Sequence, residues 1–434
     1  MTTLHDVARL AGVSTATLSD VINNTRRVKS VSGASDETTR AMLRMVRAAQ
    51  PISRADLARR LDVHRSTITE MVKPLLASGL LHEAAPEQMR ARIGRPPIGL
   101  SLREASTFFI GANIGVRRSQ VGAALVDGEM LGEETFDTPS NPDTALSQVR
   151  ASIERLRASM PDRTISAIGV SVPGPTNAER TRLLFAPHLG WCDIAVVEAL
   201  RITDPTRARV NHEVPVIVEN DATAAAMYER RRRLRNSKDG ELSDFVLVRA
   251  GTGIGVGLVI RGEVYRGTGT EGGLLGEFGH MTIVAGGKHC ACGNRGCWER
   301  YASAASATKL YAGERRHAGG GGPLRFVDIV ARAEAGEARA QVTLKRTGDY
   351  LGIGIGNIIS GLGIRRIVVS GRMVLAWKFI EKALHEAVAR TMVGRLANWS
   401  IESGEPTGAG LGGALELVIE QHLATIVAQT RSAA

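Results

Sequence analysis

The stretch HCACGNRGCWE, residues 289–299, contains three of the four cysteines of this 434-residue chain. In a reducing compartment, clustered cysteines indicate a metal site rather than a disulfide framework. Their spacing is Cys-x-Cys-x4-Cys, and His280 stands ten residues before the first of them. Three thiolates and one imidazole complete a tetrahedral zinc shell with no open position, which is typical of structural sites. We therefore predict a structural Zn²⁺ held by His280, Cys290, Cys292 and Cys297.

The residues around the cysteines suit a tight metal-binding loop. Gly293 and Gly296 allow the backbone to turn closely around an ion. His289 is a second candidate imidazole, but joint coordination with the adjacent Cys290 is sterically awkward. Three buried thiols without a metal are the alternative. The fourth cysteine, Cys192, stands apart, and we expect it to be a small core residue rather than a ligand.

The composition is that of a folded protein: 43% of the residues are hydrophobic, and no apolar run reaches the length of a membrane span. The first residues, MTTLHDVARL, lack the apolar core of a signal peptide. We therefore expect a cytoplasmic protein with no membrane partner. The formal net charge is +11, and residues 1–100 hold fifteen Lys and Arg against nine Asp and Glu. This basic excess indicates an anionic partner, nucleic acid first, with a solvated basic surface as the alternative.

From about residue 106 onward, strand-like runs alternate with helical ones. The strand-like runs are TFFIGANI (107–114), VGAALVDG (121–128), ISAIGVSV (165–172), VPVIVE (214–219), FVLVRAG (245–251) and RRIVVSG (365–371). Many end in glycine or a carboxylate, which predicts an α/β architecture with ligand-binding loops at strand ends. Glycine-bearing strand ends near Gly115 and Gly251 hint at two similar lobes. GERRHAGGGGPL (313–324) is predicted to be an exposed loop, and ERRRRLRNSK (229–238) the solvated end of a helix.

The stretch LHDVARLAGVSTATLSDVINN (4–24) predicts a helix-turn-helix unit with its turn at Gly12. Its second helix would offer Ser14, Thr15, Thr17 and Ser19 to the major groove of DNA. The pattern closely resembles the headpiece of lactose-repressor-type regulators over about thirty residues (1–30).

A second helix-turn-helix unit follows in ISRADLARRLDVHRSTITEMVKPLLASGLL (52–81). Ser53 is expected to cap one helix, Asp62 and Val63 to form the turn, and Gly79 to end the next helix. That longer helix would begin with the DNA-contacting residues Arg65, Ser66 and Thr67.

The segment HEAAPEQMRARIGRPPIGLSL (82–102) is predicted to be a β-wing. Arg90, Arg92 and Arg95 lie at its tip, where extended backbone suits insertion into the minor groove. We therefore predict a winged helix-turn-helix DNA-binding domain over residues 36–102. For either unit the alternative is a small helical protein-interaction bundle, and one of the two units can instead serve dimer contacts.

CACGNRGCWE, preceded by GEFGH, resembles the signature of the ROK family of repressors, open reading frames and sugar kinases. Further matching segments are SVPGP (171–175), APHLGW (186–191), VENDATAAA (218–226), GTGIGVGLV (251–259), EGGLLGEFGHM (271–281) and IVVSGRM (367–373). With the winged unit, the resemblance covers roughly residues 40–425. It implies an α/β actin-like (ribonuclease H-like) fold of two lobes, with a sugar pocket between them, over residues 105–425.

The resemblance also implies a set of sugar-binding residues. Asp221 matches the aspartate that deprotonates a sugar hydroxyl in the kinases, although a helix cap is the alternative role for it alone. The other matching positions are Gly174, Asn220, Glu277, His280 and Glu299. His280 would bind zinc through one ring nitrogen and face the sugar with the other, so that the metal braces the pocket.

The nucleotide side departs from the family pattern. The first phosphate loop of the kinases reads Asp-x-Gly-x-[Thr/Lys], whereas Asn113 stands here in place of the aspartate and lacks the charge to hold Mg²⁺. Where the kinases have Gly-Gly near the C-terminus, Gly371 is followed by the bulky Arg372. His188 stands where many kinases have Asn, which leaves the identity of the sugar open. Asp221 would therefore be a vestigial base, and no residue is expected to be catalytic.

These features predict a sugar-responsive transcriptional regulator, most simply a repressor of carbohydrate-metabolism genes. Its partners would be a DNA operator, a sugar or sugar phosphate effector and further copies of itself, as a homodimer or homotetramer, since a symmetric site needs a two-fold arrangement of readers. The competing class is an ATP-dependent hexose or N-acetylhexosamine kinase with an appended DNA-binding domain. A zinc-held scaffold without a ligand is the third class.

Overall fold

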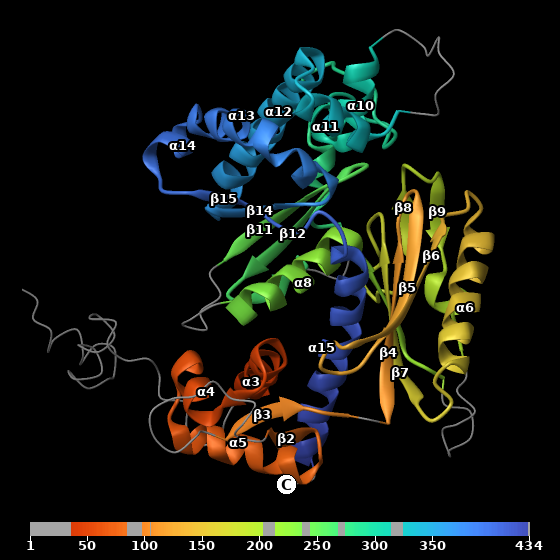
Figure 1. Ribbon diagram of the computed structural model, residues 1–434, viewed down its shortest axis with the longest axis vertical. Coiled ribbons are helices and arrows are strands. Elements are labelled where there is room, and N and C mark those ends of the chain that lie inside the picture. The colour runs from red at the N-terminus through yellow and green to blue at the C-terminus, as the bar shows by residue number, and fades with distance from the viewer. Residues whose placement is uncertain are drawn as a thin grey trace, which may run out of the picture.

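The computed structural model describes residues 36–84, 98–104, 106–202, 213–236, 244–267, 274–313 and 324–432. A winged helix unit lies at one end of the molecule, two α/β lobes form its middle, and a layer of helices lies at the other end (Figure 1). Several predicted features lie outside the described residues. These are the lactose-repressor-like stretch with Ser14, Thr15, Thr17 and Ser19, the wing tip with Arg90, Arg92 and Arg95, and residues 314–323 of the predicted loop.

The winged helix unit has the element order that its sequence predicts. It consists of α3 (Asp36–Ala49), β1 (Ile52–Ser53), α4 (Arg54–Leu61), α5 (Arg65–Ala77), β2 (Leu81–Ala84) and β3 (Gly99–Leu102), with β1, β3 and β2 forming a three-stranded sheet in that order. Ser53 Oγ accepts a hydrogen bond from Asp56 N at 3.0 Å, which confirms the predicted cap of α4. Asp62 has a φ of +52° and forms the expected turn before α5.

The two lobes are built on sheets with the same strand order. The first lobe comprises β4 (Thr107–Ile114), β5 (Arg118–Ala124), β6 (Met130–Asp137), α6 (Pro142–Ala158), β7 (Thr164–Val172), β8 (Leu183–Ala186), β9 (Trp191–Ile194), α7 (Val196–Ala199), β10 (Val216–Asn220) and α8 (Asp221–Asn236). Its sheet order is β10-β7-β4-β5-β6, in which β4, β5 and β6 are antiparallel neighbours and β7 and β10 are added in parallel beside β4.

The second lobe repeats this arrangement. It comprises β11 (Phe245–Ala250), β12 (Ile254–Ile260), β13 (Glu263–Tyr265), η2 (Glu277–His280), α9 (Glu299–Ala302), α10 (Ala304–Ala312), α11 (Phe326–Glu334), α12 (Ala338–Leu362), β14 (Arg366–Ser370), η3 (Arg372–Ala376), α13 (Trp377–Ala389), α14 (Met392–Leu396), β15 (Ser400–Ser403) and α15 (Ala409–Ser432). Its sheet order is β13-β12-β11-β14-β15, again with two parallel strands beside the first strand of an antiparallel meander. The hint of two similar lobes is therefore confirmed.

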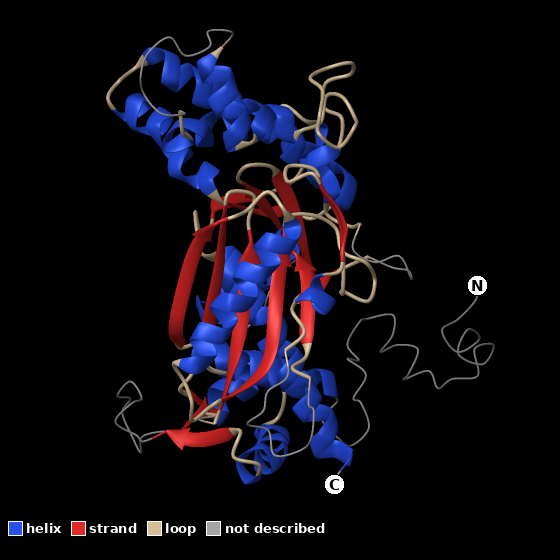
Figure 2. Ribbon diagram, turned by 90° about the vertical axis from the view of Figure 1, so that its right-hand side faces the viewer, coloured by secondary structure: helices blue, strands red, loops and turns tan. Residues whose placement is uncertain are grey.

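Two helices cross between the lobes. Helix α8 leaves the first sheet and packs on β11 and β12 of the second, whereas α15 leaves the second sheet and packs on β4 and β7 of the first. The two helices also pack against each other, and α15 runs along the molecule beside the first sheet (Figures 1 and 2). Glycines permit this close packing. A Cβ on Gly169 of β7 would lie 2.0 Å from Ala414 O of α15, and one on Gly413 of α15 would lie 2.2 Å from Ala224 O of α8.

Among the described helices, one contains a stretch with the length and hydropathy of a membrane span, Ala409–Gln429 of α15. Just over half of it, 56%, is buried inside the structure. The core of the winged helix unit is continuous with this helix. Buried residues on the two sides of that shared core include Leu43, Leu57 and Ile68 from the unit and Leu415, Val418 and Ile419 from α15. The apolar character of α15 is therefore that of a core helix.

The charge run at the end of α8 is not the solvated helix end that its composition predicts. Arg230 is only 1% exposed, and its guanidinium contacts Glu420 on α15 and Glu263 at the start of β13. Arg231 contacts Glu416 at 2.8 Å. The prediction was wrong because α15 and α3 cover this part of α8, which sequence proximity does not reveal.

The prediction that Cys192 lies in a core was also wrong, because its side chain is exposed. Cys192 lies on β9 of the two-stranded β8–β9 sheet, directly after the buried Trp191. Successive residues of a strand face opposite sides, so burying the tryptophan turns the cysteine outward.

Candidate effector and metal site

A cleft of about 360 Å³ separates the two lobes. The ends of β4, β7 and β10 contribute to it from the first lobe, and those of β11, β14 and β15 from the second. Ligands of α/β proteins commonly bind at such strand ends. All six residues expected to bind the sugar line this cleft: Gly174, Asn220, Asp221, Glu277, His280 and Glu299.

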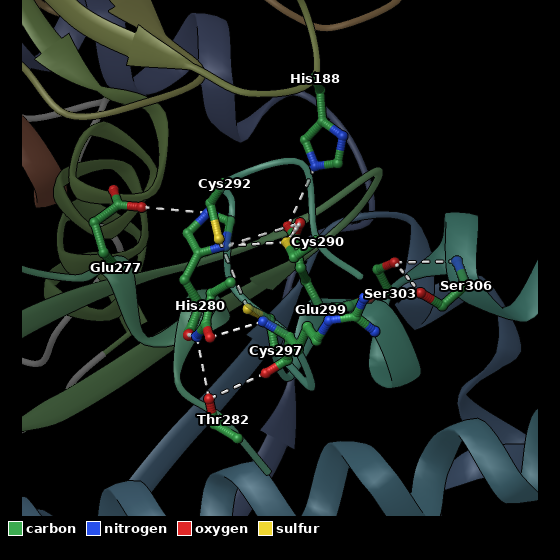
Figure 3. Close-up of polar contacts among 12 residues, drawn as sticks. His188, Glu277, His280, Thr282, Cys290, Cys292, Cys297, Glu299, Ser303 and Ser306 are labelled. Atoms are coloured by element: carbon green, nitrogen blue, oxygen red, sulfur yellow. Dashed lines mark hydrogen bonds and ion pairs between the residues drawn. The ribbon is translucent and has the colours of Figure 1, made fainter. Parts of the chain in front are cut away.

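The four predicted metal ligands lie together at the edge of this cleft (Figure 3). Each of His280, Cys290, Cys292 and Cys297 offers one donor atom, and these atoms lie within 4.8 Å of one another. The two sulfurs of Cys292 and Cys297 are 3.7 Å apart, and His280 Nδ1 is 3.6 Å from Cys290 Sγ. Tetrahedral zinc with ordinary bond lengths would separate two sulfurs by about 3.8 Å and a nitrogen from a sulfur by about 3.6 Å. The donor set therefore fits a zinc ion.

Two glycines shape the loop that carries the cysteines. Gly293 and Gly296 have φ angles of +94° and +76°, and a Cβ on Gly296 would lie 1.8 Å from Val284 O. His289, the competing imidazole, is exposed and does not belong to the group of four donors. Burial raises the pKa of the Cys290 and Cys297 thiols, and a bound cation would favour their thiolate forms.

Glu299, at the start of α9, links the cysteine cluster to the cleft. One of its carboxylate oxygens is 3.3 Å from Cys290 Sγ, and the other is 3.2 Å from His188 Nε2 in the first lobe. The side chain is buried, which by itself would raise its pKa, but the hydrogen bond and charge of His188 and the charge of His280 hold the pKa below its usual value. Glu299 is thus an ionised group that spans the two lobes through His188.

His280 faces two ways, as the sequence predicts for a residue with two tasks. Its Nδ1 points toward Cys290, and its Nε2 is 3.7 Å from a carboxylate oxygen of Glu277 (Figure 3). Burial, together with the charges of Asp221 and Glu299, raises the pKa of Glu277 to about 7. Near neutral pH, Glu277 can therefore donate a hydrogen bond to a hydroxyl when it is protonated, or accept one from a hydroxyl when it is ionised.

Asn220 takes the role of helix cap, which was the alternative considered for Asp221. Its Oδ1 accepts hydrogen bonds from Ala222 N at 2.9 Å and Thr223 N at 3.2 Å, at the start of α8. Its Nδ2 donates to Gly174 O at 3.1 Å. The same side chain thus joins the start of α8 to the loop that follows β7 and holds this wall of the cleft in place.

Asp221 is engaged by a residue that the sequence reasoning missed. Arg249, on β11 of the second lobe, donates from Nη1 to Asp221 Oδ2 at 2.5 Å. The available signal was a single arginine inside the otherwise apolar run FVLVRAG (245–251). The guanidinium of Arg249 thus occupies one carboxylate oxygen of Asp221 and joins the start of α8 to the second lobe.

The amide of Asn113 is used within the first lobe. Its Nδ2 donates to Gln120 Oε1 at 3.4 Å, and its Oδ1 accepts from Ser171 Oγ at 2.9 Å. The side chain is 7% exposed and carries no charge. It therefore offers no carboxylate to Mg²⁺ on the nucleotide side of the cleft.

The described part of the candidate DNA interface lies on α5, at the end of the molecule opposite the helical layer (Figure 1). Arg65 and Ser66 are exposed, and Thr67 is half-buried. His64 caps this helix: its Nδ1 accepts from Ser66 N at 3.4 Å and lies 2.7 Å from Ser66 Oγ. The three residues that the sequence predicts to meet DNA thus occupy the first turn of the helix.

The sequence profile of the ROK family matches residues 109–421, which include the cleft and the four metal ligands. The chain belongs to the ROK family. Bacterial regulatory proteins of the lacI family match residues 3–41, and a helix-turn-helix domain matches residues 34–84. This ROK protein therefore carries helix-turn-helix sequence ahead of its two lobes.

Relatives of this ROK protein include both repressors and kinases. The xylose repressor of Bacillus subtilis is 27% identical over 363 residues, which cover 82% of this chain and 88% of the relative. The glucokinase of Streptomyces coelicolor is 28% identical over 329 residues, covering 72% of this chain and 97% of the relative. Among solved structures, a ROK family transcriptional regulator homologous to the Escherichia coli MLC protein has a TM-score of 0.67 and 24% identity, covering 91% of this chain and 99% of that one. The structural likeness supports the two-lobe actin-like fold, and the family model over residues 34–84 supports a helix-turn-helix DNA-binding region ahead of it.

Proposed function

We propose that this ROK protein is a sugar-responsive, DNA-binding transcriptional repressor of carbohydrate-metabolism genes, working in the cytoplasm as a homodimer or homotetramer. The winged helix-turn-helix domain (36–102) would bind the operator, and the ROK domain (105–425) would bind the effector. The observation that carries this proposal is the pairing of Asp221 with Arg249 in a cleft that keeps its hydroxyl-binding groups. Such a cleft is suited to recognising a sugar, whereas the carboxylate at the position of the family's base is already occupied by the guanidinium of Arg249.

The effector would be held mainly by polar groups of the cleft walls. Glu277, His280 and Glu299 would bind hydroxyls from the second lobe, and Asn220 with the Gly174 loop would border the ring from the first. A site built to hydrogen-bond hydroxyls strongly rejects analogues that lack them, since its buried polar groups would then stay unpaired.

The metal would be Zn²⁺, held by His280, Cys290, Cys292 and Cys297, and it would act as a structural brace. Its charge would stabilise the thiolates that burial disfavours. His280 and Glu299 both contact the sulfur of Cys290, and both also line the cleft. A metal that fixes the cluster would therefore keep these two hydroxyl-binding side chains in one geometry.

Operator binding would depend on the first turn of α5 and on the wing. Arg65, Ser66 and Thr67 would meet the major groove, and Arg90, Arg92 and Arg95 at the wing tip would reach the minor groove. The lactose-repressor-like stretch adds Ser14, Thr15, Thr17 and Ser19 as further candidates. Which unit reads bases is a matter for footprinting with each unit altered in turn.

The signal from cleft to operator would travel along α8 and α15. Asp221 is the first residue of α8, and α15 begins at Ala409 in the cleft wall. Both helices run from the cleft toward α3 of the winged helix unit, where α15 and α3 share a core. Closing the lobes on an effector would therefore shift the surface on which the DNA-binding unit is seated.

A buried ion-pair joint links both helices to α3. Arg47 of α3 is 4% exposed; its guanidinium contacts Glu416 of α15, and its Nε donates to Val126 O of the first lobe at 2.7 Å. Arg231 of α8 contacts the other carboxylate oxygen of Glu416. Three helices thus meet at one carboxylate, and any change in their relative positions must rearrange that contact.

The test is an operator-binding titration of the full-length protein against a panel of monosaccharides and their phosphates. We expect at least one of them to change operator affinity. No change with any member of the panel would contradict the proposal.

The kinase alternative is favoured by one observation, the similarity to a glucokinase over 72% of the chain. Incubation with Mg-ATP and the same panel separates the two functions. We expect no sugar-dependent ADP formation above background, because Asn113 lacks the metal-binding carboxylate and Asp221 is paired. Sugar-dependent turnover of ATP would establish the kinase instead.

A further inference from the structure

The cleft is chemically divided. Three acidic residues of its lining, Asp221, Glu277 and Glu299, lie close together, because the charges of Asp221 and Glu299 help to raise the pKa of Glu277. Four arginines also line this cleft: Arg117, Arg118, Arg249 and Arg372. Arg117 and Arg118 follow β4 in the first lobe, whereas Arg249 and Arg372 stand at the ends of β11 and β14 in the second. Four cations that converge from two lobes are more than the recognition of a neutral sugar requires.

The carboxylates near these arginines do not neutralise them all. Asp221 pairs with Arg249, and the exposed Asp137 lies 3.6 Å from Arg118. Glu405 also lines the cleft, but it contacts Arg232. Within the described ranges, neither Arg117 nor Arg372 has a carboxylate oxygen within 4.0 Å.

Arg372 shows how poorly compensated this charge is. It is half-buried, and burial lowers the pKa of its guanidinium. The charges of Arg117, Arg249 and Arg118 lower that pKa further. A guanidinium held among three others, partly out of water, is stabilised by an anion placed between them.

The first turn of α15 adds backbone donors to the same place. Thr407, Gly408, Ala409 and Gly410 line the cleft, and the 24-residue helix begins at Ala409. Gly408 accepts the first helical hydrogen bond, from Gly412 N at 2.9 Å, and has no side chain with which to cap the helix. The unpaired N–H groups and the dipole at such a helix start favour a bound anion. Arginines from two lobes and a helix start therefore face one volume.

We infer that the effector is a phosphorylated monosaccharide, with its hydroxyls on the acidic wall and its phosphate among Arg117, Arg249, Arg372 and the start of α15. An arginine guanidinium can donate two parallel hydrogen bonds to two oxygens of a phosphate, so this site would not need Mg²⁺ to hold the phosphate. The inference rests on the proposed function and narrows its effector from a sugar or sugar phosphate to the phosphorylated form.

Arg249 connects the two halves of such a ligand. It already bonds Asp221, which borders the hydroxyl-binding wall, and it lies close enough to Arg372 to depress its pKa. A phosphate attached to the sugar would therefore lie between Arg249 and Arg372, next to the hydroxyl-binding groups. Because Arg249 belongs to the second lobe and Arg117 to the first, the phosphate would also draw the lobes together.

The experiment is calorimetric titration of the full-length protein with matched pairs of ligands. The pairs are glucose with glucose 6-phosphate and N-acetylglucosamine with N-acetylglucosamine 6-phosphate, and inorganic phosphate alone is a further probe. We expect a phosphorylated member to bind at least about tenfold more tightly than its neutral partner, with a preference that weakens as salt rises. Inorganic phosphate should compete weakly with it.

Variants of the phosphate side sharpen the result. Arg372→Gln should reduce the ratio of phosphorylated to neutral affinity by about tenfold or more, and Arg372→Lys should reduce it less, because charge remains while the fork is lost. Arg155→Gln, which removes a surface arginine paired with Glu134, is the matched control and should leave the ratio unchanged. Melting curves of all variants check that each is folded.

The outcomes separate this inference from the function on which it rests. Neutral sugars that bind as tightly as their phosphates and shift operator affinity would overturn the inference and leave the regulator intact. An unchanged ratio in Arg372→Gln would also overturn it. The absence of binding by every sugar, neutral or phosphorylated, would overturn the proposed function and the inference with it.

Discussion

The two lobes share one strand order, yet they carry different parts of the machinery. Between β13 and β14 the second lobe inserts the cysteine cluster and helices α9 to α12, and this insertion supplies Glu277 and Glu299 to the cleft. The corresponding part of the first lobe, between β6 and β7, is the single helix α6. The winged helix unit instead shares its core with α15, which packs on the first sheet. A shared topology brings strand ends to one cleft, and the insertions decide what each lobe does there.

This contrast predicts that effector recognition and the response of DNA binding depend on different parts of the molecule. Damage to the cysteine cluster should harm the effector site of the second lobe first, whereas damage to the Arg47–Glu416 joint should uncouple the DNA-binding unit on the side of the first lobe. Helices α8 and α15, which cross between the lobes, connect the cleft to the DNA-binding unit, so both kinds of damage should affect them.

The largest effect is expected when the metal cluster of the second lobe is broken. Cys292→Ser should lower the free energy of unfolding by about 4 kcal/mol, because a structural zinc site contributes directly to folding stability. Thermal melting with and without a chelator measures this, and effector affinity should fall with it. Cys192→Ser, which alters the exposed cysteine, is the control and should melt like the natural chain. Equal melting of both variants would show that the cluster holds no metal.

A somewhat smaller effect is expected at the joint. Arg47→Met should lower the free energy of unfolding by about 3 kcal/mol, because it leaves a buried Glu416 with Arg231 as its remaining partner. Operator titrations should also show a weaker response to effector, while effector affinity changes less.

The control for the joint is Arg155→Met on the surface, which should melt unchanged. A variant of Arg47 that loses effector affinity and effector response to the same extent would contradict the division between the lobes.

A smaller effect is expected at the operator. Arg65→Ala should weaken operator binding by about tenfold and make its dependence on salt less steep, because one guanidinium contact to DNA is lost. Electrophoretic mobility shifts at several salt concentrations measure both quantities. Lys382→Ala removes a positive charge from the helical layer at the far end of the molecule, and it should leave binding unchanged. Equal losses in the two variants would indicate that only net charge matters.

The smallest effect is expected for the imidazole that stands next to the cysteines but outside their cluster. His289→Ala should leave zinc content and melting unchanged, whereas His280→Ala should lower both. Metal analysis of the two purified variants is the measurement. Zinc loss in His289→Ala alone would move the fourth ligand to that residue.

Much of the fold could be predicted from local signals. The winged helix unit follows from the Ser53 cap and the turn at Asp62, because both features act within a few residues of the chain. The strand-like runs predicted the central strands of both sheets, since continuous apolar runs suit strands buried on both faces. The cysteine spacing, with His280 ten residues before it, identified a donor set that the structure brings within 4.8 Å.

The predictions that failed concern which side chains are buried and which groups they contact, and the packing of the folded chain decides both. The charge run that contains Arg230 resembles a solvated helix end, but carboxylates almost two hundred residues away cover and pair it. Cys192 has the composition of a core residue, but the neighbouring Trp191 is buried, so Cys192 faces the opposite, exposed side of the strand. The pairing of Asp221 with Arg249 depends on two lobes facing each other across a cleft, and no local pattern encodes that distance.

By itself, the sequence predicted many of the elements and the candidate metal ligands, because caps, periodicity and spacing act over one or two turns of chain. The candidate hydroxyl-binding residues came instead from the resemblance to the ROK family. Only the tertiary structure decided which charges are buried and what they meet. Burial and Coulomb interactions depend on distances in space, and the crossing of α8 and α15 between the lobes sets those distances.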